Sequence, residues 1–378
     1  MIEIDGSYGE GGGQILRTAL GLSCLFKKPF RIFNIRKGRK KPGLMPQHLT
    51  AVRAAQLLSS AEIKGDHTGS TELIFLPKEV KCGDFFFDIG TAGSTSLVLQ
   101  TLIPSLTFLN NPPTPFFTKG RREGFEQRKT TVTLKGGTHV PFSPSYDYLA
   151  EVFSFFLEKI GIKIKLTVES YGFYPKGGGK VRAEIYPAKE IRPLHILKRG
   201  TILKLAGYSA VGNLPLSIAE RQRRGCLEKM NMAGFEMSGN MPELLSEQKA
   251  DNREPLDINV ISVSTIGQGT FIFLRSESEN SVAGFTSLGE RGKRAETVGE
   301  EAATEFLEYY STGAALDSHM ANQIVLYLSL SGEESVFTTS CITQHLMTNL
   351  WAIGLFHDYR YTVEGEVGKA GKVKINNR

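Results

Sequence analysis

The stretch "DGSYGEGGGQILRT" (Asp5–Thr18) joins a short apolar segment to a longer, helix-like one through a glycine-rich loop. The segment before the loop, Ile2–Ile4, is typical of a β-strand, and the segment after it, Gln14–Leu25, is typical of an α-helix. Such a loop favours an anion, because its backbone N–H groups and the dipole of the next helix attract negative charge. Glu10 would repel that anion. The loop is therefore either a plain tight turn or an anion site in which a cation separates Glu10 from the anion.

The same order of strand, glycine-rich turn and helix returns in "DIGTAGSTSLVLQTLIPSL" (Asp88–Leu106). Two further helices are predicted, one over Pro46–Ala61, which begins with a proline, and one over Tyr146–Gly161, which ends with a glycine. The second of these is followed by a strand, a glycine loop and another strand. Repetition of one pattern along a chain predicts a fold built from repeated units of strands and helices.

This pattern is interrupted near residue 185. The stretch 185–279 is typical of a separate small α/β module, and the earlier pattern returns near Gly284, with helices predicted over 295–313 and 343–356. We therefore expect an α/β (α+β) fold class with two domains. Residues 1–184 and 280–378 form the large, repeat-built domain, and residues 185–279 form a small inserted α/β domain. A chain of 378 residues is long enough for both.

The composition is that of a globular protein, with 40% hydrophobic and 22% charged residues. The net charge of +6 is compatible with an anionic partner. No segment is apolar over a length that would span a membrane, and the N-terminus is typical of a strand rather than of a signal peptide. The four cysteines form no CxxC pair, which argues against structural zinc and a dithiol redox site and favours a reducing, cytoplasmic location. They are Cys24, Cys82, Cys226 and Cys341.

Three polar residues lie close together where the first predicted helix begins. Glu10, Gln14 and Arg17 provide a carboxylate, an amide and a guanidinium beside the glycine loop. This combination suits a triphosphate bridged by Mg²⁺ or Mn²⁺. A second glycine-rich stretch, Tyr171–Val181, is interpreted as a turn with packed aromatic residues, and the alternative is that Lys176 faces a phosphate.

A basic run, "RKGRKKPG" (Arg36–Gly43), follows the second predicted strand and precedes Gln47 and His48. Cations at this density are typical either of a solvated loop or of a surface that binds RNA phosphates. A second basic stretch, Lys119–Lys129, adds positive charge and an aromatic residue. The sequence alone leaves both interpretations open.

His345 stands near the start of a predicted helix, where Thr343 is the expected N-cap. A helix N-terminus disfavours the imidazolium form, so the ring is expected to be neutral. A neutral imidazole nitrogen can attack a phosphoryl group and form a covalent intermediate. A lone histidine is more often structural, and the residue pattern alone leaves this alternative open. The other histidines show no spacing typical of metal ligands.

Five stretches of the chain, in order, resemble the RNA 3′-terminal phosphate cyclase family. They span residues 1–185 and about 284–355, which is most of the chain outside the predicted insert. The fold implied by this resemblance has three repeated β-α-β-α-β-β units and a small inserted α/β domain. The stretches are "DGSYGEGGGQILRTALGLS" (5–23), "RKGRKKPGLMPQHLTAVRA" (36–54), "IGTAGSTSLVLQT" (89–101), "GFYPKGGG" (172–179) and "TQHLMTN" (343–349).

The resemblance implies an ATP-dependent conversion of an RNA 3′-terminal phosphate to a 2′,3′-cyclic phosphate, with Mg²⁺ or Mn²⁺. The histidine at the position of His345 attacks the α-phosphate of ATP, which gives a covalent histidine–AMP intermediate and pyrophosphate. AMP then moves to the RNA 3′-phosphate, giving RNA-(3′)pp(5′)A. Attack by the neighbouring 2′-OH closes the ring and expels AMP.

The resemblance also implies roles for other residues. Glu10 matches the position that holds the metal. The positions implied for ATP and its phosphates are Gln14, Arg17, Gln100, Pro144, His319, Asn322 and Gln323, and those implied for the RNA phosphate are Arg36, Arg39, Gln47 and His48.

The stretch around His319 departs from the family pattern Tyr-x-x-Asp-Gln. His319 takes the place of the tyrosine, and its smaller ring can still stack on adenine. Asn322 takes the place of the aspartate, which keeps a carbonyl acceptor and loses the charge. Gln323 matches the pattern, which favours an intact site.

Three other classes of protein fit the sequence less well. The family includes a cyclase-like relative that lacks the catalytic histidine and acts in ribosomal RNA processing; His345 argues against that alternative and Asn322 argues weakly for it. Enolpyruvyl-type transferases have a similar repeat architecture, but they act on small anions and have no use for the Arg36–Gly43 run. A lysine-dependent RNA ligase is disfavoured because the motif Lys-x-Asp-Gly is absent. The cellular RNA and the oligomeric state stay open.

Overall fold

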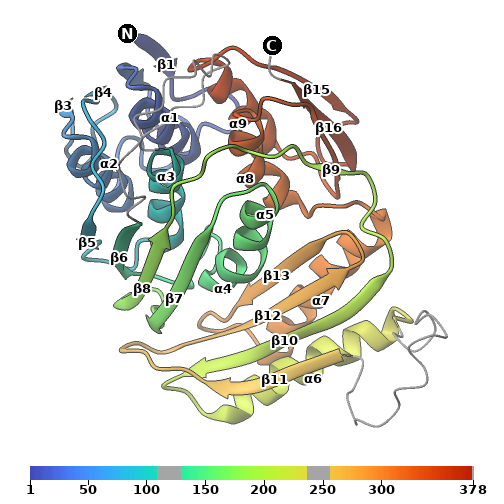
Figure 1. The fold of residues 1–378 in the computed structure, drawn as a ribbon. Helices are drawn as coiled ribbons and strands as arrows, with labels where there is room; N and C mark the ends of the chain where they lie inside the picture. Colours follow the sequence, from blue (N-terminus) through green and yellow to red (C-terminus); the bar gives the residue numbers. More distant parts are fainter. Residues whose placement is uncertain (109–128, 236–255, 377–378) are drawn as a thin grey trace.

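The computed structural model describes residues 1–108, 129–235 and 256–376. It has a mixed α/β fold with four four-stranded sheets, so the predicted fold class is confirmed (Figure 1). The second basic stretch lies outside the described residues except for Lys129. Within the described residues, no helix combines the length and apolarity that crossing a membrane requires.

The first sheet has the strand order β1-β2-β4-β3, in which β1 and β2 are parallel and the other pairs are antiparallel. Helix α1 begins at the end of the glycine loop, and α2 begins at Pro46 as predicted. The elements are β1 (Ile2–Asp5), α1 (Gly13–Phe26), β2 (Phe30–Phe33), α2 (Pro46–Ser59), β3 (Glu62–Lys64) and β4 (Leu73–Leu76).

The second sheet, β5-β6-β8-β7, has the same order and the same strand directions. Its second helical segment is continuous but contains one π-helical turn, η1, between two α-helical parts. The elements are β5 (Asp84–Asp88), α3 (Thr95–Thr107), β6 (Thr130–Gly136), α4 (Tyr146–Tyr148), η1 (Leu149–Phe153), α5 (Ser154–Lys159), β7 (Ile164–Ser170) and β8 (Gly179–Ile185).

The third sheet, β9-β14-β16-β15, repeats the arrangement once more, with β9 and β14 parallel and the remaining pairs antiparallel. Its first strand is far from the others in sequence. The elements are β9 (His195–Ile196), α8 (Ser318–Leu328), β14 (Ser335–Thr339), α9 (Gln344–Gly354), β15 (Arg360–Glu364) and β16 (Gly371–Asn376).

The fourth sheet, β11-β10-β12-β13, is formed by the residues between β9 and α8. Helices α6 and α7 pack against each other and share with this sheet a core of its own, which extends from Leu205 to Tyr309. The elements are β10 (Ile202–Gly212), α6 (Leu216–Met232), β11 (Leu256–Ser262), β12 (Gly269–Ser278), β13 (Val282–Leu288) and α7 (Ala295–Thr312).

The residues that share this second core differ from the stretch 185–279, which the sequence predicted as the inserted domain. Strand β9 lies within that stretch but pairs with β14 of the third sheet. Strand β13 and helix α7 lie beyond it, yet Phe285 and Phe306 belong to the core of the fourth sheet. Amphipathic periodicity identifies the buried face of a helix such as α7 but not the sheet that covers it.

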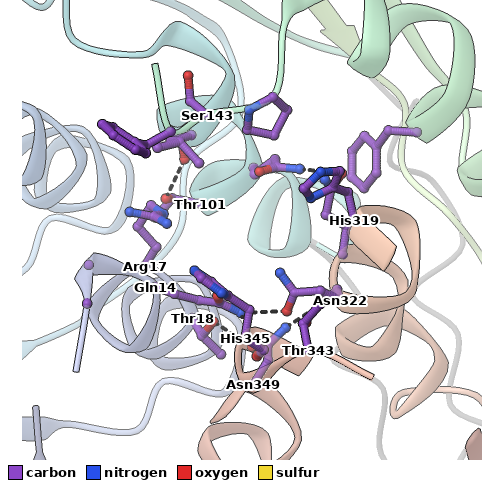
Figure 2. Close-up of a pocket in the computed structure, with 18 of the residues that line it drawn as sticks. Gln14, Arg17, Thr18, Thr101, Ser143, His319, Asn322, Thr343, His345 and Asn349 are labelled. Atoms are coloured by element: carbon purple, nitrogen blue, oxygen red, sulfur yellow. Dashed lines mark hydrogen bonds between the residues drawn. The ribbon is translucent and has the colours of Figure 1, made fainter. Parts of the chain in front are cut away.

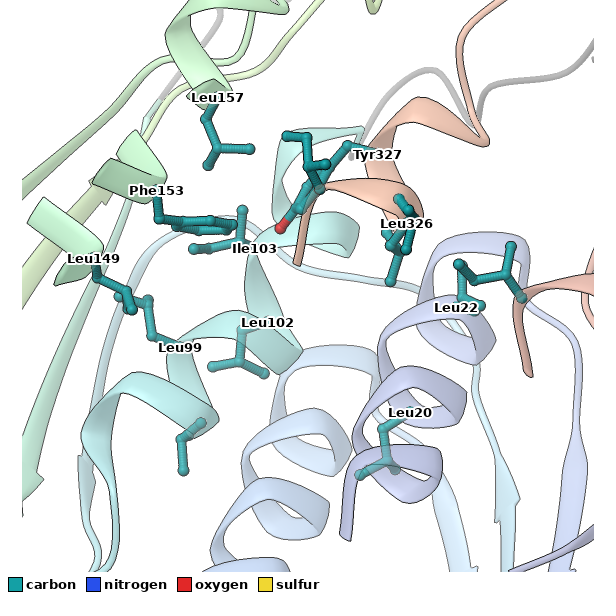
Figure 3. Close-up of a cluster of buried hydrophobic side chains, with 14 of the residues drawn as sticks. Leu20, Leu22, Leu99, Leu102, Ile103, Leu149, Phe153, Leu157, Leu326 and Tyr327 are labelled. Atoms are coloured by element: carbon teal, nitrogen blue, oxygen red, sulfur yellow. The ribbon is translucent and has the colours of Figure 1, made fainter. Parts of the chain in front are cut away.

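The main core lies where helices of the three similar sheets meet. Figure 3 shows side chains from α1, α3, η1–α5 and α8 converging in one cluster. The approach of α1 to α3 is close at Gly21, where an added Cβ would lie 2.9 Å from the carbonyl oxygen of Thr101. The labelled members are Leu20, Leu22, Leu99, Leu102, Ile103, Leu149, Phe153, Leu157, Leu326 and Tyr327. This packing fixes the helix ends that form the site.

Candidate functional site

A cavity of about 850 Å³ opens between these helices. Its lining comes from segments far apart in the chain, including the glycine loop, α1, α3, α7, α8 and α9. Figure 2 shows side chains of α1, α3, α8 and α9 around it. All the residues that the sequence pointed to as site residues line it, whereas Lys176 is not among its lining residues. The residues brought together are Glu10, Gln14, Arg17, Arg36, Arg39, Gln47, His48, Gln100, Pro144, His319, Asn322, Gln323 and His345.

The glycine loop is fixed to helix α9. The backbone N–H of Glu10 donates to Thr348 Oγ1 at 3.2 Å, and the ring of Tyr8 stacks on Trp351 with 3.9 Å between centroids. Gly9 has a φ of +58°, and a Cβ there would lie 2.3 Å from Thr348 Oγ1. A residue with a side chain at position 9 would therefore push the loop away from the helix.

His345 is the second residue of α9. Thr343 caps this helix as predicted, because its Oγ1 accepts the backbone N–H of Leu346 at 3.1 Å. The imidazole Nε2 lies 3.6 Å from Glu10 Oε2, which is longer than a hydrogen bond, and the side chain is 52% exposed. Burial lowers the pKa of His345, and the charges of Arg17, His319 and Arg39 lower it further. The ring is therefore neutral near pH 7 and has a free lone pair.

An amide network lies behind His345 and ties α1, α8 and α9 together (Figure 2). Gln14 Nε2 donates to Asn322 Oδ1 at 2.6 Å and to the carbonyl oxygen of His345 at 3.3 Å. Asn349 Nδ2 donates to the carbonyl oxygen of Asn322 at 2.8 Å, and Thr18 Oγ1 donates to Asn349 Oδ1 at 2.8 Å. The side-chain oxygen of Asn322 thus serves as the acceptor for Gln14 without a negative charge.

We call the part of the cavity around Glu10, Arg17, Arg36, Arg39, His48 and His345 the cationic end. Burial lowers the pKa of Arg17 to about 10, so its guanidinium stays charged at neutral pH. Burial, together with Arg17 and Arg36, lowers the pKa of His48 to about 3. His48 Nδ1 accepts the backbone N–H of Met45 at 3.0 Å, which assigns the ring proton to Nε2. His48 is therefore a neutral hydrogen-bond donor.

The basic run folds back on itself at this end. Arg36 has a φ of +55°, and its Nη1 donates to the carbonyl oxygens of Lys41 and Gly43 at 2.8 and 3.1 Å. Arg39 pairs with the carboxylate of Glu10. Arg36 and Arg39 are thus held at the cavity wall, and the run is more than a solvated loop.

Glu10 is the candidate ligand for a divalent metal. In the described parts of the chain, no three His, Cys, Asp or Glu side chains are grouped as metal ligands. Mg²⁺ is commonly held by only one or two protein carboxylates and takes its remaining ligands from phosphates and water. Glu10 directs its carboxylate toward both Arg39 and His345. This donor chemistry fits a metal that arrives with bound phosphates, and it does not fit a metal site made of protein ligands alone.

We call the opposite part of the cavity, around Pro144, Tyr148, Thr286, Glu305 and His319, the far end. Tyr148 presents its ring edge-on to His319, with 6.2 Å between centroids, and its hydroxyl donates to buried Asp317 at 2.7 Å. Asp317 in turn caps α8. Figure 2 shows His319 across the cavity from Arg17.

A pair of amides lies along the wall between α3 and α8. Gln100 Nε2 donates to Gln323 Oε1 at 2.8 Å. The assignment of oxygen and nitrogen in such a pair follows from the hydrogen bond itself. The other polar atoms of this pair, Gln100 Oε1 and Gln323 Nε2, are able to contact a ligand.

Several lining or supporting residues were not identified from the sequence. Thr348 and Asn349 lie three and four residues after His345, and this helical spacing was an available signal. Thr18 lies four residues after Gln14 and had the same signal. No sequence signal pointed to Tyr148 or Glu305, because their positions depend on packing between segments far apart in the chain.

The chain has close relatives of known identity. A sequence model of the RNA 3'-terminal phosphate cyclase family matches residues 8–363. The chain is 46% identical over 367 residues to the protein named RNA 3'-terminal phosphate cyclase of Sulfolobus acidocaldarius, a match that covers 97% of each chain. It is 40% identical over 378 residues to the protein of the same name from Pyrococcus abyssi, covering 100% of this chain and 99% of the relative. The corresponding protein of Ignicoccus hospitalis is 42% identical over 376 residues, covering 99% and 98%.

Proposed function

Because this chain belongs to the RNA 3'-terminal phosphate cyclase family, we propose that it converts the 3′-terminal phosphate of RNA to a 2′,3′-cyclic phosphate with ATP as co-substrate. The observation that carries the proposal is the pairing of a neutral His345 with the cations of the cationic end in one cavity. A neutral nitrogen beside arginines suits attack on a bound phosphate.

In the first step, His345 Nε2 attacks the α-phosphorus of ATP. A nitrogen–phosphorus bond forms, the bond between the α-phosphorus and the bridging oxygen breaks, and pyrophosphate leaves. Arg17 and the neutral donor His48 bind the phosphates and stabilise the charge that develops on the leaving group. The amide network through Gln14 and Asn322 holds the backbone of α9 so that the imidazole keeps its direction.

In the second step, an oxygen of the RNA 3′-phosphate attacks the same phosphorus and breaks its bond to His345. AMP is now joined to the RNA in an RNA-(3′)pp(5′)A intermediate, and the histidine is free again. The RNA phosphate would be held during this transfer by Arg36 and Arg39 of the basic run and by Gln47, which follows it. In the third step, the ribose 2′-OH attacks the 3′-phosphorus, loses its proton and expels AMP.

Glu10 would hold Mg²⁺ or Mn²⁺ when nucleotide is bound, and the metal would neutralise phosphate charge and favour attack at phosphorus. Arg39 must then turn from Glu10 toward the phosphates.

We also infer that the three similar sheets are three copies of one β-α-β-α-β-β unit. Their common strand order and strand directions support this inference. The fourth sheet with α6 and α7 would then be a domain inserted into the third unit, after β9. Its core supports boundaries near residues 200 and 312 in place of 185 and 279. A cytoplasmic location, expected from the scattered cysteines, belongs to the same proposal.

The experiment uses α-labelled ATP with Mg²⁺ or Mn²⁺, and measures label that stays on the denatured protein. We expect label that is acid-labile and base-stable, as in a histidine phosphoramidate, and we expect none with His345→Ala. His67→Ala, at an exposed histidine outside the cavity lining, is the matched control and should leave the label unchanged.

RNA with a 3′-phosphate should then release AMP and end in a cyclic phosphate. The same RNA with a terminal 2′-deoxyribose should stop at RNA-(3′)pp(5′)A, because the hydroxyl that closes the ring is missing. A folded protein that binds this RNA but takes no label with either metal would refute the proposed reaction. It would favour the alternative of a cyclase-like RNA-binding protein without catalytic activity.

A further inference from the structure

A second, smaller cavity lies on the side of helix α2 that faces away from His48. It has a volume of about 400 Å³ and lies between α2, the loop before β4 and strand β5. Figure 1 shows β5 next to α2. We call this cavity the α2 groove, and its lining residues are Pro46, Leu49, Thr50, Arg53, Thr68, Phe86, Phe87, Asp88 and Ile89.

The α2 groove and the cationic end share the first turn of α2. Residues 46, 49, 50 and 53 lie on one face of this helix, since they are three, four and seven positions apart, and they line the groove. Gln47 and His48 lie on the opposite face and line the first cavity. At Gly93 an added Cβ would lie 3.1 Å from Cβ of Gln47, so the second glycine-rich turn packs against the same residue. The groove thus begins one residue away from a side chain proposed to hold the RNA 3′-phosphate.

The groove presents an aromatic ring and a cation. Phe86 of β5 is 58% exposed, whereas Phe85 and Phe87, on the opposite face of the strand, pack against the main core. Arg53 is exposed and has no hydrogen-bond or ion-pair partner among the described residues. An exposed ring beside a cation is the combination that binds single-stranded nucleic acid, because a base stacks on the ring and the cation attracts the backbone.

The charge around the groove favours a polyanion. Asp88, the one acidic residue among the described lining residues of the groove, pairs with Lys135 at 3.0 Å and accepts the backbone N–H of Gly90 at 2.8 Å. Its charge is therefore compensated. The basic run lies beside the groove, because the N–H of Gly69, next to Thr68, donates to the carbonyl oxygen of Leu44 at 2.8 Å. The exposed lysines of that run are Lys37, Lys40 and Lys41.

We propose that the α2 groove binds RNA just before its 3′-terminal nucleotide, with a base stacked on Phe86 and a backbone phosphate on Arg53. The inference rests on the proposed function, which places the RNA 3′-phosphate at the cationic end. The volume of the groove lies within the range of small-ligand sites and suits one nucleotide unit. Since every base has a face that can stack, the groove would accept any RNA sequence but would require an unpaired end.

The length of the RNA separates the groove from the cationic end. The ligands are a nucleoside 3′-phosphate, which reaches the cationic end alone, and a short single-stranded RNA with a 3′-phosphate, which reaches both. With the full chain already carrying labelled AMP, we measure how the rate of AMP transfer depends on the concentration of each ligand. The RNA should reach half-maximal rate at a concentration at least tenfold lower than the nucleoside 3′-phosphate, which is about the effect of one stacked base.

Phe86→Ala should remove this advantage of the longer ligand. We expect the half-saturating concentration to rise about tenfold for the RNA and to stay the same for the nucleoside 3′-phosphate. Phe86→Tyr keeps an aromatic face and should behave like the unaltered protein. Leu57→Ala, at an exposed apolar residue of α2 outside the groove, is the matched control. Labelling of each variant by ATP, which does not involve the groove, shows that the variant is folded.

Arg53→Gln should change the salt dependence of RNA binding. Loss of one phosphate contact lowers the slope of log affinity against log salt concentration by about 0.7 for a single strand. Phe86→Ala should weaken binding without changing this slope. Lys64→Gln, at an exposed lysine of β3 outside the groove, should leave the slope in place. An equal change with Lys64→Gln would show diffuse attraction to the surface and would overturn the inference.

Two further results would overturn the inference. One is an RNA that binds the unaltered protein no more tightly than the nucleoside 3′-phosphate, and the other is a loss in Phe86→Ala that is equal for both ligands. Binding is also measured without ATP, by fluorescence anisotropy of the RNA and competition by the nucleoside 3′-phosphate. A protein that takes no label from ATP, but binds RNA more weakly in both groove variants, would refute the proposed reaction and leave the groove in place.

Discussion

The two ends of the cavity are built differently. At the cationic end, hydrogen bonds join the glycine loop to α9 and join α1 to both α8 and α9, so the backbone that carries Glu10 and His345 is fixed. At the far end, Tyr148 and Thr286 are hydrogen-bonded to Asp317 and Ser145, whereas the described contacts include no hydrogen bond from the side chain of Glu305 or His319. The backbone that carries Glu10 and His345 is therefore held by hydrogen bonds, whereas the side chains of Glu305 and His319 at the far end are not.

The two positions at which the resemblance implies a departure from the family pattern lie in different parts of the cavity. His319, where the resemblance implies a tyrosine, lies at the far end. Asn322, where the resemblance implies an aspartate, accepts the hydrogen bond from Gln14 in the amide network. Substitutions at the cationic end should accordingly have much larger effects than substitutions at the far end.

Gly9→Ala should have the largest effect. The added methyl group would lie 2.3 Å from Thr348 Oγ1, at a backbone φ of +58°. The loop would move from α9 and take Glu10 away from His345, and we expect single-turnover labelling to fall about 100-fold, as for a displacement of about 1 Å.

The control for this prediction is Gly69→Ala. Gly69 has a φ of +82°, but nothing lies within 4 Å of an added Cβ, so it reproduces the backbone strain without the clash. Equal losses of labelling in both variants would show that the contact between loop and helix is not what matters.

Thr348→Val should have the next largest effect. Valine has nearly the same shape but cannot accept the N–H of Glu10, so labelling should fall about tenfold, and the metal concentration needed for half-maximal rate should rise. Thr348→Ser keeps the hydroxyl and should restore most of the rate. A serine variant as slow as the valine variant would point to methyl packing as the cause.

Arg39→Gln should change the pH dependence. The acid side of the rate profile reports protonation of His345, whose pKa is lowered by burial and by Arg17, His319 and Arg39. Without the charge of Arg39, the pKa of His345 rises, so the rate should begin to fall at a pH higher by about half a unit. Lys40→Gln, an exposed neighbour outside the cavity lining, should leave the profile in place.

His319→Tyr should have the smallest effect. A tyrosine ring offers more stacking area to adenine, and we expect the KM for ATP to fall about threefold with kcat almost unchanged. Steady-state kinetics with ATP separate the two constants. A change in kcat of the same size would show that position 319 influences the reaction at His345 and would contradict the smaller effect expected at the far end.

Much of the fold and of the cationic end follows from local sequence. Pro46 begins α2 and Thr343 caps α9 because each signal is contained within a few residues. The predicted site residues come together because they lie in the loops and first turns that follow strands of similar units. Strand β9 was missed, since two residues carry no periodicity.

The far end could not be read from the sequence. Glu305 is one of several glutamates on α7, and its place in the cavity lining distinguishes it from Glu308. The extent of the second core could not be predicted for the same reason. The apolar face of α7 does not show which sheet it packs against.

The contact between Tyr8 and Trp351 has a practical consequence. Trp351 is the chain's single tryptophan, and its indole stacks at 3.9 Å on a ring of the glycine loop, one helical turn beyond Thr348. Its intrinsic emission therefore reports on one place in the molecule, without an added dye. Any shift of the loop relative to α9 therefore becomes an optical signal on the timescale of stopped flow.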